Sequence, residues 1–306
     1  MILCLSGFSQ DKDSLSVIPD SLKINEINLN DLKFISFKDD NILNRKSKKD
    51  IDYLFLSGMG AAYLGAGLSV HLYQANAWWS GERSDFKFAE DWDYALWIDK
   101  VGHFYATHLI AHFFSAGLEK TNIDYATNIW ISSSAALAFQ IFVEIEDGFA
   151  QKWGFSRGDA ISNLLGASYP VFQFYFPYLY NFQPRFSYYP TKLGKEGHIA
   201  GQNLIITDDY EGQKFWLSMR IKNILPKSIA DPIPDFLMLS LGYGVRNLDG
   251  RGGGFSDLYI SLDIDYEKIP LYGEFWQFVK NTLGYFKFPM PGIRVNNGTT
   301  FFLLCY

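Results

Sequence analysis

The sequence predicts an α+β fold in which a four-helix, membrane-associated bundle precedes a small antiparallel sheet of about six strands. Four long segments without Asp, Glu, Lys or Arg occur between residues 54 and 180, and apolar residues alternate with polar ones after Pro190. Long uncharged segments favour helices, whereas a period of two favours strands with one polar face. We therefore expect a signal remnant and polar tether over 1–50, a helical bundle over 51–190 and a β domain over 191–306.

The composition favours a chain that touches lipid in one part and water in another. Aromatic residues make up 18% of the chain and charged residues 20%, below the roughly 25% charged residues of soluble domains. The mean hydropathy of -0.04 is too polar for a transporter with many spans. A net charge of -6 offers no broad basic field for nucleic acid, and 2 cysteines are too few for a disulfide framework or a thiolate metal site.

The first ten residues, MILCLSGFSQ, are similar to the end of a secretory signal peptide, although a basic start is missing and the apolar run is short. We expect a start codon placed too late, with a disordered apolar N-terminus as the alternative. The polar stretch 11–50 is expected to be a tether. Its basic cluster, Arg45-Lys46-Ser47-Lys48-Lys49, would be solvated or face anionic lipid headgroups.

The first uncharged segment, Leu54 to Tyr73, is long enough to cross about 30 Å of hydrocarbon as a helix. Its glycines and alanines would allow close helix contact in lipid, and Trp78 and Trp79 follow it as an interfacial belt would. A buried helix in a soluble bundle is the alternative.

Three further uncharged segments complete the predicted bundle: Val101 to Leu118, Ala126 to Val143, and Ala160 to Tyr180. Pro170 and Pro177 should kink or end the last of them. Because the connections are short, we expect an up-and-down arrangement of antiparallel neighbours.

Alternating segments predict three hairpins in the β domain. They are expected over about 202–222 with a turn at Glu211-Gly212, about 236–266 with a turn in 249–254, and about 292–306 with a turn at Asn296-Asn297-Gly298. A short helix over Glu274 to Leu283 separates the last two.

Ionisable and amide side chains gather at three helix ends that an up-and-down bundle brings to the same side. The start of the second helix, the end of the third and the start of the fourth carry them, and Gln140, Glu144 and Asp147 share one stripe of the third helix. The expected cluster comprises Asp99, Lys100, His103, Gln140, Glu144, Asp147, Arg157, Asp159 and Asn163.

One imidazole and three carboxylates at His103, Glu144, Asp147 and Asp159 would suit a hard or borderline divalent cation, so these four are candidate metal ligands and candidate catalytic groups. No cofactor other than such a cation is expected. The alternatives are helix caps at Asp99 and Asp159 and a structural ion-pair cluster. The spacing matches no established metal motif, and no nucleophile signature is present.

His108 and His112 stand four residues apart on the second predicted helix. The first of them is not followed by the acid that a His-Glu-x-x-His zinc motif requires. We therefore expect both to be packed or hydrogen-bonded histidines of the bundle.

At these residues the chain resembles an uncharacterised bacterial envelope family described as predicted periplasmic lipoproteins of unknown function. The resemblance lies in Asp99-Lys100-Val101-Gly102-His103-Phe104, in Glu144 with Asp147-Gly148-Phe149, in Trp153-Gly154-Phe155-Ser156 with Gly158-Asp159, and in Asn163 with Gly166. It covers about residues 95–190. More remotely, the order of these motifs is similar to that of VanZ-like membrane proteins. The resemblance implies an envelope location and a shared polar cluster, and it implies no activity. The first residues of the sequence do not match a lipoprotein signal, so we do not expect attachment through a lipid from them.

The function expected from these observations is a non-enzymatic cell-envelope membrane protein, a docking or accessory subunit of an outer-membrane or periplasmic assembly. Its partners would be membrane lipid and other envelope proteins, with no nucleic acid, and the outer membrane is favoured over the inner one. Exposed sheet edges would accept a partner strand. The alternative is a membrane-embedded enzyme, metal-dependent or not, that acts on a lipid or cell-wall intermediate through His103, Glu144, Asp147 and Asp159.

Overall fold

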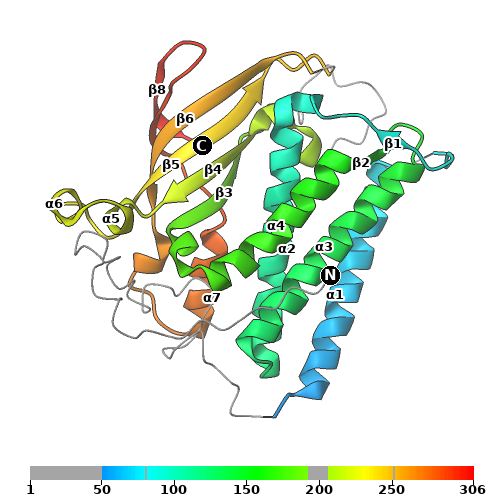
Figure 1. The fold of residues 1–306 in the computed structure, drawn as a ribbon, viewed down its shortest axis with the longest axis horizontal. Coiled ribbons are helices and arrows are strands. Elements are labelled where there is room, and N and C mark those ends of the chain that lie inside the picture. The colour runs from blue at the N-terminus through cyan, green and yellow to red at the C-terminus, as the bar shows by residue number, and fades with distance from the viewer. Residues whose placement is uncertain (1–49, 80, 192–205, 251) are drawn as a thin grey trace, which may run out of the picture.

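The computed structural model describes residues 50–79, 81–191, 206–250 and 252–306, and it places a group of helices beside a twisted sheet (Figure 1). The α+β class and the six-stranded antiparallel sheet are confirmed. The signal remnant, most of the tether and the basic cluster before residue 50 lie outside the described residues.

Four long helices form where the uncharged segments predict them: α1 (Tyr53–Ala77), α2 (Ile98–Leu118), α3 (Tyr125–Phe149) and α4 (Arg157–Tyr175). Side chains that accept a backbone N–H cap three of them, at Asp52, Asp124 and Ser156. Pro170 lies inside α4, and the helix ends two residues before Pro177, which starts a 3₁₀ turn.

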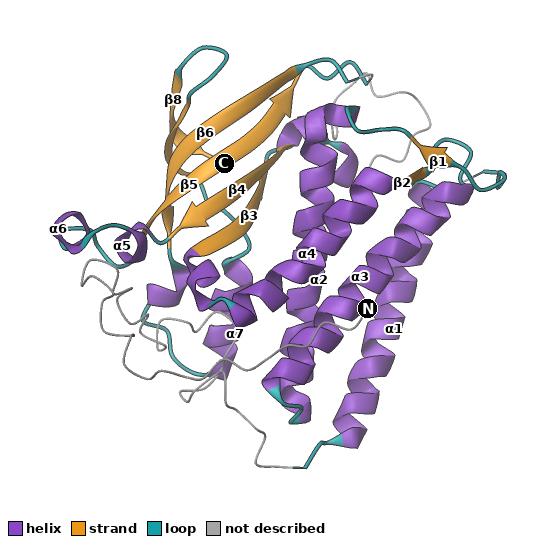
Figure 2. Ribbon diagram, in the orientation of Figure 1, coloured by secondary structure: helices purple, strands orange, loops and turns teal. Residues whose placement is uncertain are grey.

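Helices α2, α3 and α4 pack closely on one another, whereas α1 lies along the outside of this group (Figure 2). The α1 helix carries no charged residue and has no buried residue. Two of the described helices, α1 and α3, are long and apolar enough to cross a membrane. In the most apolar 18-residue segment of each helix, 39% of α3 is buried, against 0% of α1. Packing inside the protein therefore accounts for part of the apolar character of α3.

The sheet runs in the order β3-β4-β5-β6-β7-β8, with every neighbouring pair antiparallel. Its strands are β3 (Phe182–Tyr188), β4 (Gln213–Met219), β5 (Leu237–Arg246), β6 (Phe255–Ile264), β7 (Met290–Arg294) and β8 (Thr300–Cys305). The second and third predicted hairpins and the helix α7 (Glu274–Leu283) are therefore confirmed. Two short helices, α5 (Ile221–Ile224) and α6 (Lys227–Ala230), connect β4 to β5.

The first predicted hairpin is wrong. Of its first half, residues 202–205 lie outside the described part, and residues 206–208 and 210–212 form 3₁₀ turns. The partner of β4 is β3, which precedes Pro190 and pairs Phe182 with Met219 and Tyr188 with Gln213. The chain thus enters the sheet directly after the fourth helix.

The two faces of the sheet differ in an unexpected way. Side chains of Leu217, Leu241, Ile260, Ile293 and Phe301 form one apolar row across five strands, and Leu217, Leu241 and Phe301 are exposed. The opposite face is polar and buried, and it contains the ion pair between Arg185 and Asp263. Strands with one polar face were predicted, but here the polar face points into the molecule.

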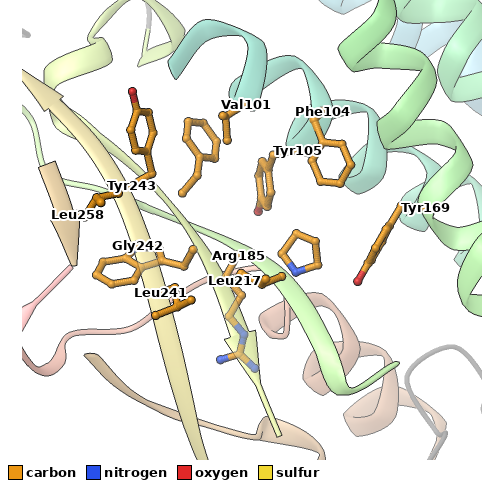
Figure 3. A pocket seen from close by; sticks show the side chains of 13 residues that line it. Val101, Phe104, Tyr105, Tyr169, Arg185, Leu217, Leu241, Gly242, Tyr243 and Leu258 are labelled. Carbon is orange, nitrogen blue, oxygen red and sulfur yellow. The ribbon is translucent and has the colours of Figure 1, made fainter. Parts of the chain in front are cut away.

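One end of the apolar face packs against α2 and forms a core shared by helices and sheet. Its buried members are Ala95, Ile98, Tyr105, Phe215, Val245 and Tyr285. Beside this core lies a cavity of about 320 Å³ between Phe104, Tyr105 and Tyr169 on the helices and Leu241 and Gly242 on the sheet (Figure 3). Its lining is mostly apolar, with Arg185 among it, and it includes no residue of the predicted polar cluster.

Candidate functional site: a buried polar cluster

The start of α2, the end of α3 and the start of α4 lie at the same end of the helical group, next to the short strands β1 (Phe88–Ala89) and β2 (Phe155–Ser156) (Figure 1). These two strands pair in parallel, Phe88 with Phe155 and Ala89 with Ser156. Their pairing ties the segment before α2 to the segment between α3 and α4, and it thereby fixes the loops around the cluster.

The entry into α2 is a left-handed turn of three residues, Ala95, Leu96 and Trp97, all with positive φ angles. Residues other than glycine pay roughly 1–2 kcal/mol each for this conformation. Packing offsets the cost, because Ala95 and Ile98 are buried in the shared core and the hydroxyl of Tyr243 donates to the carbonyl oxygen of Leu96. The turn is thus held from the sheet, and it sets where Asp99, Lys100 and His103 begin.

Lys100 lies at the centre of the cluster and is 3% exposed. Its Nζ is 2.9 Å from Asp91 Oδ2, 3.3 Å from Asp99 Oδ2 and 3.3 Å from Asp159 Oδ1. Burial opposes the ammonium charge, but the three carboxylates outweigh it and raise the pKa of Lys100. Lys100 is therefore a fixed positive charge that joins the three acids.

His103 faces acceptors on both sides of its ring. Nδ1 lies 3.2 Å from Asn163 Oδ1 and 3.4 Å from Glu144 Oε1. Nε2 lies 3.8 Å from Asp99 Oδ1 and 3.9 Å from Asp159 Oδ2, distances too long for hydrogen bonds. Burial lowers the pKa of His103, and the surrounding carboxylates raise it by more, so the net shift is upward.

Glu144 is the most deeply buried acid of the cluster, at 1% exposure. Burial raises its pKa to about 8, and the repulsion of Asp159 and Asp147 adds to this, while His103 opposes it. Its Oε2 accepts from the backbone N–H of Ser156 over 3.3 Å. Its Oε1 accepts no hydrogen bond from any described residue. Glu144 is therefore a buried carboxyl with one oxygen left for a further partner.

Asp147 and Asp159 also have raised pKa values, each about 6, with burial as the largest cause. Asp147 Oδ1 accepts from Trp79 Nε1 over 2.6 Å, so the end of α1 reaches the cluster. Asp159 is held in place at the start of α4, where its backbone N–H donates to Ser156 Oγ over 3.1 Å.

Asn163, on α4, contacts side chains of both α2 and α3. Its Oδ1 accepts from Thr107 Oγ1 over 2.9 Å and lies 3.5 Å from Gln140 Nε2, in addition to its contact with His103. Its Nδ2 donates to no described residue. The stripe of α3 predicted from the sequence thus faces α2 and α4 through Gln140 and Glu144.

The structure therefore brings together eight of the nine residues that the sequence singled out, namely Asp99, Lys100, His103, Gln140, Glu144, Asp147, Asp159 and Asn163. Arg157 is not among them. Its guanidinium is 3.8 Å from Glu90 and lies over the ring of Phe88, and its side chain is exposed.

Sequence reasoning missed five residues that touch the cluster: Trp79, Asp91, Thr107, Ser156 and Tyr210. Ser156 and Asp159 form a Ser-x-x-Asp pattern that could have revealed the helix cap. Tyr210 donates to Asp99 Oδ1 over 2.8 Å from a turn 111 residues away, and no local pattern predicts that contact.

His108 and His112 lie outside the cluster, further along α2. Both are buried, and burial lowers their pKa values to about 3 and about 4. Their rings contact that of Tyr285, and His112 Nε2 is 3.2 Å from Thr282 Oγ1. They are neutral packing histidines, as the sequence predicted.

Among the described residues, one group has the composition and spacing of metal ligands: Asp99, His103 and Asp159 each offer one atom within 4.8 Å of the others. Chemically, this arrangement offers donor atoms of the kind that cations take, and its histidine and three carboxyls with raised pKa values are groups suited to proton transfer in a largely buried space.

Comparison with known proteins confirms the resemblance stated from the motifs. Residues 87–175 match a family model described as predicted periplasmic lipoprotein (DUF2279). This segment contains the whole cluster apart from Trp79 and Tyr210, and it covers less than a third of the chain. No curated protein and no solved structure matches the chain, and the similarity to VanZ-like proteins is not shown.

Proposed function

We propose that this chain is a non-enzymatic membrane protein of the cell envelope, anchored by α1. The observation that carries the proposal is that this 25-residue apolar helix has no buried residue. A helix of this length whose apolar surface is mostly exposed matches the hydrocarbon thickness of a bilayer.

The match of residues 87–175 to a family of predicted periplasmic lipoproteins supports an envelope location. The position of the aromatic residues supports anchorage, because Trp78 and Trp79 follow the apolar helix directly, as interfacial anchors do. In this arrangement the cluster would lie near the membrane surface, since Trp79 donates to Asp147.

Anchorage can be tested by placing charges on α1. Leu64 and Leu68 are 77% and 58% exposed and lie near the middle of the helix. Each lysine there costs roughly 2.5–3.5 kcal/mol of insertion free energy in a membrane, but nothing in the folded body. We expect Leu64→Lys with Leu68→Lys to move the tagged protein from the detergent-extracted fraction of washed envelopes to the soluble fraction.

The matched control replaces the same two leucines by alanine, which keeps the helix apolar, and it should stay in the membrane fraction. A lysine variant that remains membrane-bound after an alkaline wash would refute anchorage through α1. Sucrose-gradient separation of the two membranes in the same cells tests the further expectation that the outer membrane holds the protein.

Strand β8, at one edge of the sheet, offers a surface on which a partner protein could dock. Its outer edge pairs with no described strand, and Phe301, Leu303 and Leu304 on it are exposed. Such an edge accepts an extended strand from another protein. We propose a partner envelope protein that adds a strand along β8.

A charge on this edge should block strand addition. We expect Leu303→Lys to shift the protein solubilised from native membranes from a larger complex to the monomer in blue-native electrophoresis. The control Ile229→Lys changes another exposed apolar residue, on α6 and away from β8, and should leave the complex intact. Wild-type protein that migrates as a monomer would remove the docking proposal.

A second candidate function, an enzyme acting on a lipid or cell-wall intermediate, is favoured by the cluster itself. Raised pKa values at Glu144 and Asp159 beside His103 are typical of sites that transfer protons. In a strain whose phenotype depends on this chain, Glu144→Gln and Asp159→Asn should abolish that phenotype at unchanged protein abundance if it is an enzyme. A scaffold would keep the phenotype in both variants for as long as they remain folded.

A further inference from the structure

We propose that Asp99, His103 and Asp159 form a binding site for one divalent metal ion of the Zn²⁺ or Mn²⁺ type. The site goes beyond the proposed function, because neither anchorage nor docking requires an ion. It also differs from the ligand set expected from the sequence, since Asp99 takes part while Glu144 and Asp147 contact other groups.

The orientation of His103 is the first argument. Its Nδ1 lies 3.2 Å from one acceptor, Asn163 Oδ1, and 3.4 Å from another, Glu144 Oε1, so the hydrogen of the neutral ring belongs on Nδ1. The lone pair of Nε2 then points toward Asp99 Oδ1 and Asp159 Oδ2. Three electron-pair donors then face one another, an arrangement that a metal cation stabilises, as would a second proton on the ring.

Lys100 fixes the two aspartates in this arrangement. It contacts Oδ2 of Asp99 and Oδ1 of Asp159, both at 3.3 Å, and these are the oxygens that do not face His103. Tyr210 also donates to Asp99 Oδ1, which limits the rotation of that carboxylate. The ligand atoms are thus held in place by neighbouring groups before any ion binds, as in established metal sites.

Two further buried polar atoms lie on the other side of the His103 ring, away from the proposed ligand oxygens. Glu144 Oε1 and Asn163 Nδ2 are buried and form no hydrogen bond with any described residue. An ion on Nε2 would polarise the opposite N–H of the ring and so favour a hydrogen bond from it to a carboxylate, as in carboxylate–histidine–zinc triads. Glu144 lies in the position of that carboxylate. The unused oxygen of a 1% exposed side chain therefore has a function in the metal-bound state.

The charge of the cluster agrees with this assignment. Asp91, Asp99 and Asp159 all contact the single ammonium group of Lys100. One ammonium group does not balance the charge of three carboxylates. A ligand set of one imidazole and two carboxylates suits Zn²⁺ and Mn²⁺ better than Cu⁺ or an iron–sulfur cluster, and three protein ligands leave coordination positions for water.

The experiment uses the full chain, purified in detergent without a histidine tag and stripped with a chelator. After dialysis against Zn²⁺ or Mn²⁺, elemental analysis should give one ion per chain. The spin-echo spectrum of bound Mn²⁺ should show coupling to one imidazole nitrogen, and that coupling should disappear in His103→Gln. Asp99→Asn and Asp159→Asn should each lose stoichiometric binding.

Two further variants separate metal ligands from general charge effects. Glu144→Gln should weaken binding roughly 10–100-fold, because it removes only the group that orients the ligand. Glu146→Gln removes an acid from the same helix end, where the side chain pairs with Arg83 instead, and it should bind as the wild type does. Circular dichroism of each variant verifies that the helices are intact.

Wild-type protein that holds less than stoichiometric metal, or Mn²⁺ without nitrogen coupling, would overturn the proposal. Equal weakening by Glu146→Gln and Asp159→Asn would also overturn it, since that result indicates attraction by net charge. Because these readouts use purified protein and no envelope partner, their failure leaves anchorage through α1 untouched.

Discussion

Trp79 Nε1 donates a hydrogen bond of 2.6 Å to Asp147 Oδ1, and this contact joins the end of α1 to the polar cluster. The two residues are 68 positions apart in the chain. The bond therefore connects the exposed apolar helix, which we propose as the membrane anchor, to the helices that carry the candidate site.

The strength of this bond should depend on pH. Burial raises the pKa of Asp147 from 3.8 to about 6, and the bond from Trp79 lowers it, because the indole N–H favours the charged carboxylate. A carboxyl with a raised folded-state pKa costs stability as pH rises from 3.8 to about 6, and the full cost persists above that value. Losing the bond should increase this cost.

We therefore expect Trp79→Phe to destabilise the protein by about 1–2 kcal/mol more at roughly pH 8 than at roughly pH 4, since hydrogen bonds to charged groups are stronger than those to neutral ones. Chemical denaturation in detergent at the two pH values measures the difference. In the background of Asp147→Asn the two values should agree, because the side chain no longer ionises. A pH-dependent difference that survives in that background would assign the effect to another group.

The buried histidines of α2 should limit stability in acid. Burial lowers the pKa of His112 to about 4 from 6.5, so the folded state holds the ring neutral. For a base with a lowered folded-state pKa, the unfolding free energy is highest above pH 6.5. It falls as the pH drops from 6.5 toward 4, because the unfolded state binds the proton before the folded state does. Each pH unit in this range costs about 1.4 kcal/mol.

His112→Gln removes the titrating group and keeps a donor near Thr282. Between roughly pH 7 and pH 5 the wild type should lose about 2 kcal/mol more unfolding free energy than the variant does. Thr282→Val, which removes the partner of His112 and adds no ionisable group, should change stability equally at both pH values. If the wild type and His112→Gln lose the same unfolding free energy as the pH falls over this range, the assignment to His112 is contradicted.

The helices and the later hairpins could be predicted because their patterns are local. Leu54 to Tyr73 contains no Asp, Glu, Lys or Arg, and Ile260, Leu262 and Ile264 alternate with Ser261 and Asp263, so neighbouring residues suffice to recognise both patterns. Strand β3 was missed for a physical reason. Gln183, Arg185 and Ser187 alternate with Phe182, Phe186 and Tyr188, but Pro184 stands inside the run. Proline is rare inside a strand and is tolerated here because β3 is an edge strand of the sheet, which no local pattern shows.

The cluster could be predicted only in part for a similar reason. The order of helix ends places His103, Glu144 and Asp159 together, since short connections between helices force alternation of direction. The contacts of Asp91 and Tyr210 depend on how the loop before α2 and the turn before β4 fold against α2. No spacing in the sequence indicates these contacts. Likewise, Arg157 is near the others in sequence, but it projects outward toward Glu90.

The close approach of α2 and α4 gives a further prediction. A Cβ atom at Gly166 would lie 2.2 Å from the carbonyl oxygen of Phe104, so only glycine fits between the two helices. Gly166→Ala should destabilise the protein by about 1–3 kcal/mol through overpacking. The control Gly60→Ala, where no atom lies within 4 Å, should be neutral or slightly stabilising. Thermal unfolding compares the two, and equal effects would contradict the packing argument.

The buried ion pair under the sheet provides the last prediction. Arg185 and Asp263 are both 0% exposed, and Arg185 Nη1 lies 2.9 Å from Asp263 Oδ1. The hydroxyl of Ser240 donates to Asp263 Oδ2 over 2.9 Å, so the carboxylate retains a neutral partner when arginine is removed. Arg185→Met should nevertheless destabilise the protein by roughly 3–5 kcal/mol, because an unpaired charge stays buried.

Adding Asp263→Asn to Arg185→Met should recover most of that loss, since the amide oxygen can accept the same serine hydroxyl without a charge. Denaturant titration of the wild type, the single variant and the double variant measures both effects. Because the pair lies on the buried polar face of the sheet, the single variant should also loosen β3, the strand that directly follows the helices. A double variant no more stable than Arg185→Met would show that arginine acts through packing, for example over the ring of Tyr266, and not through its charge.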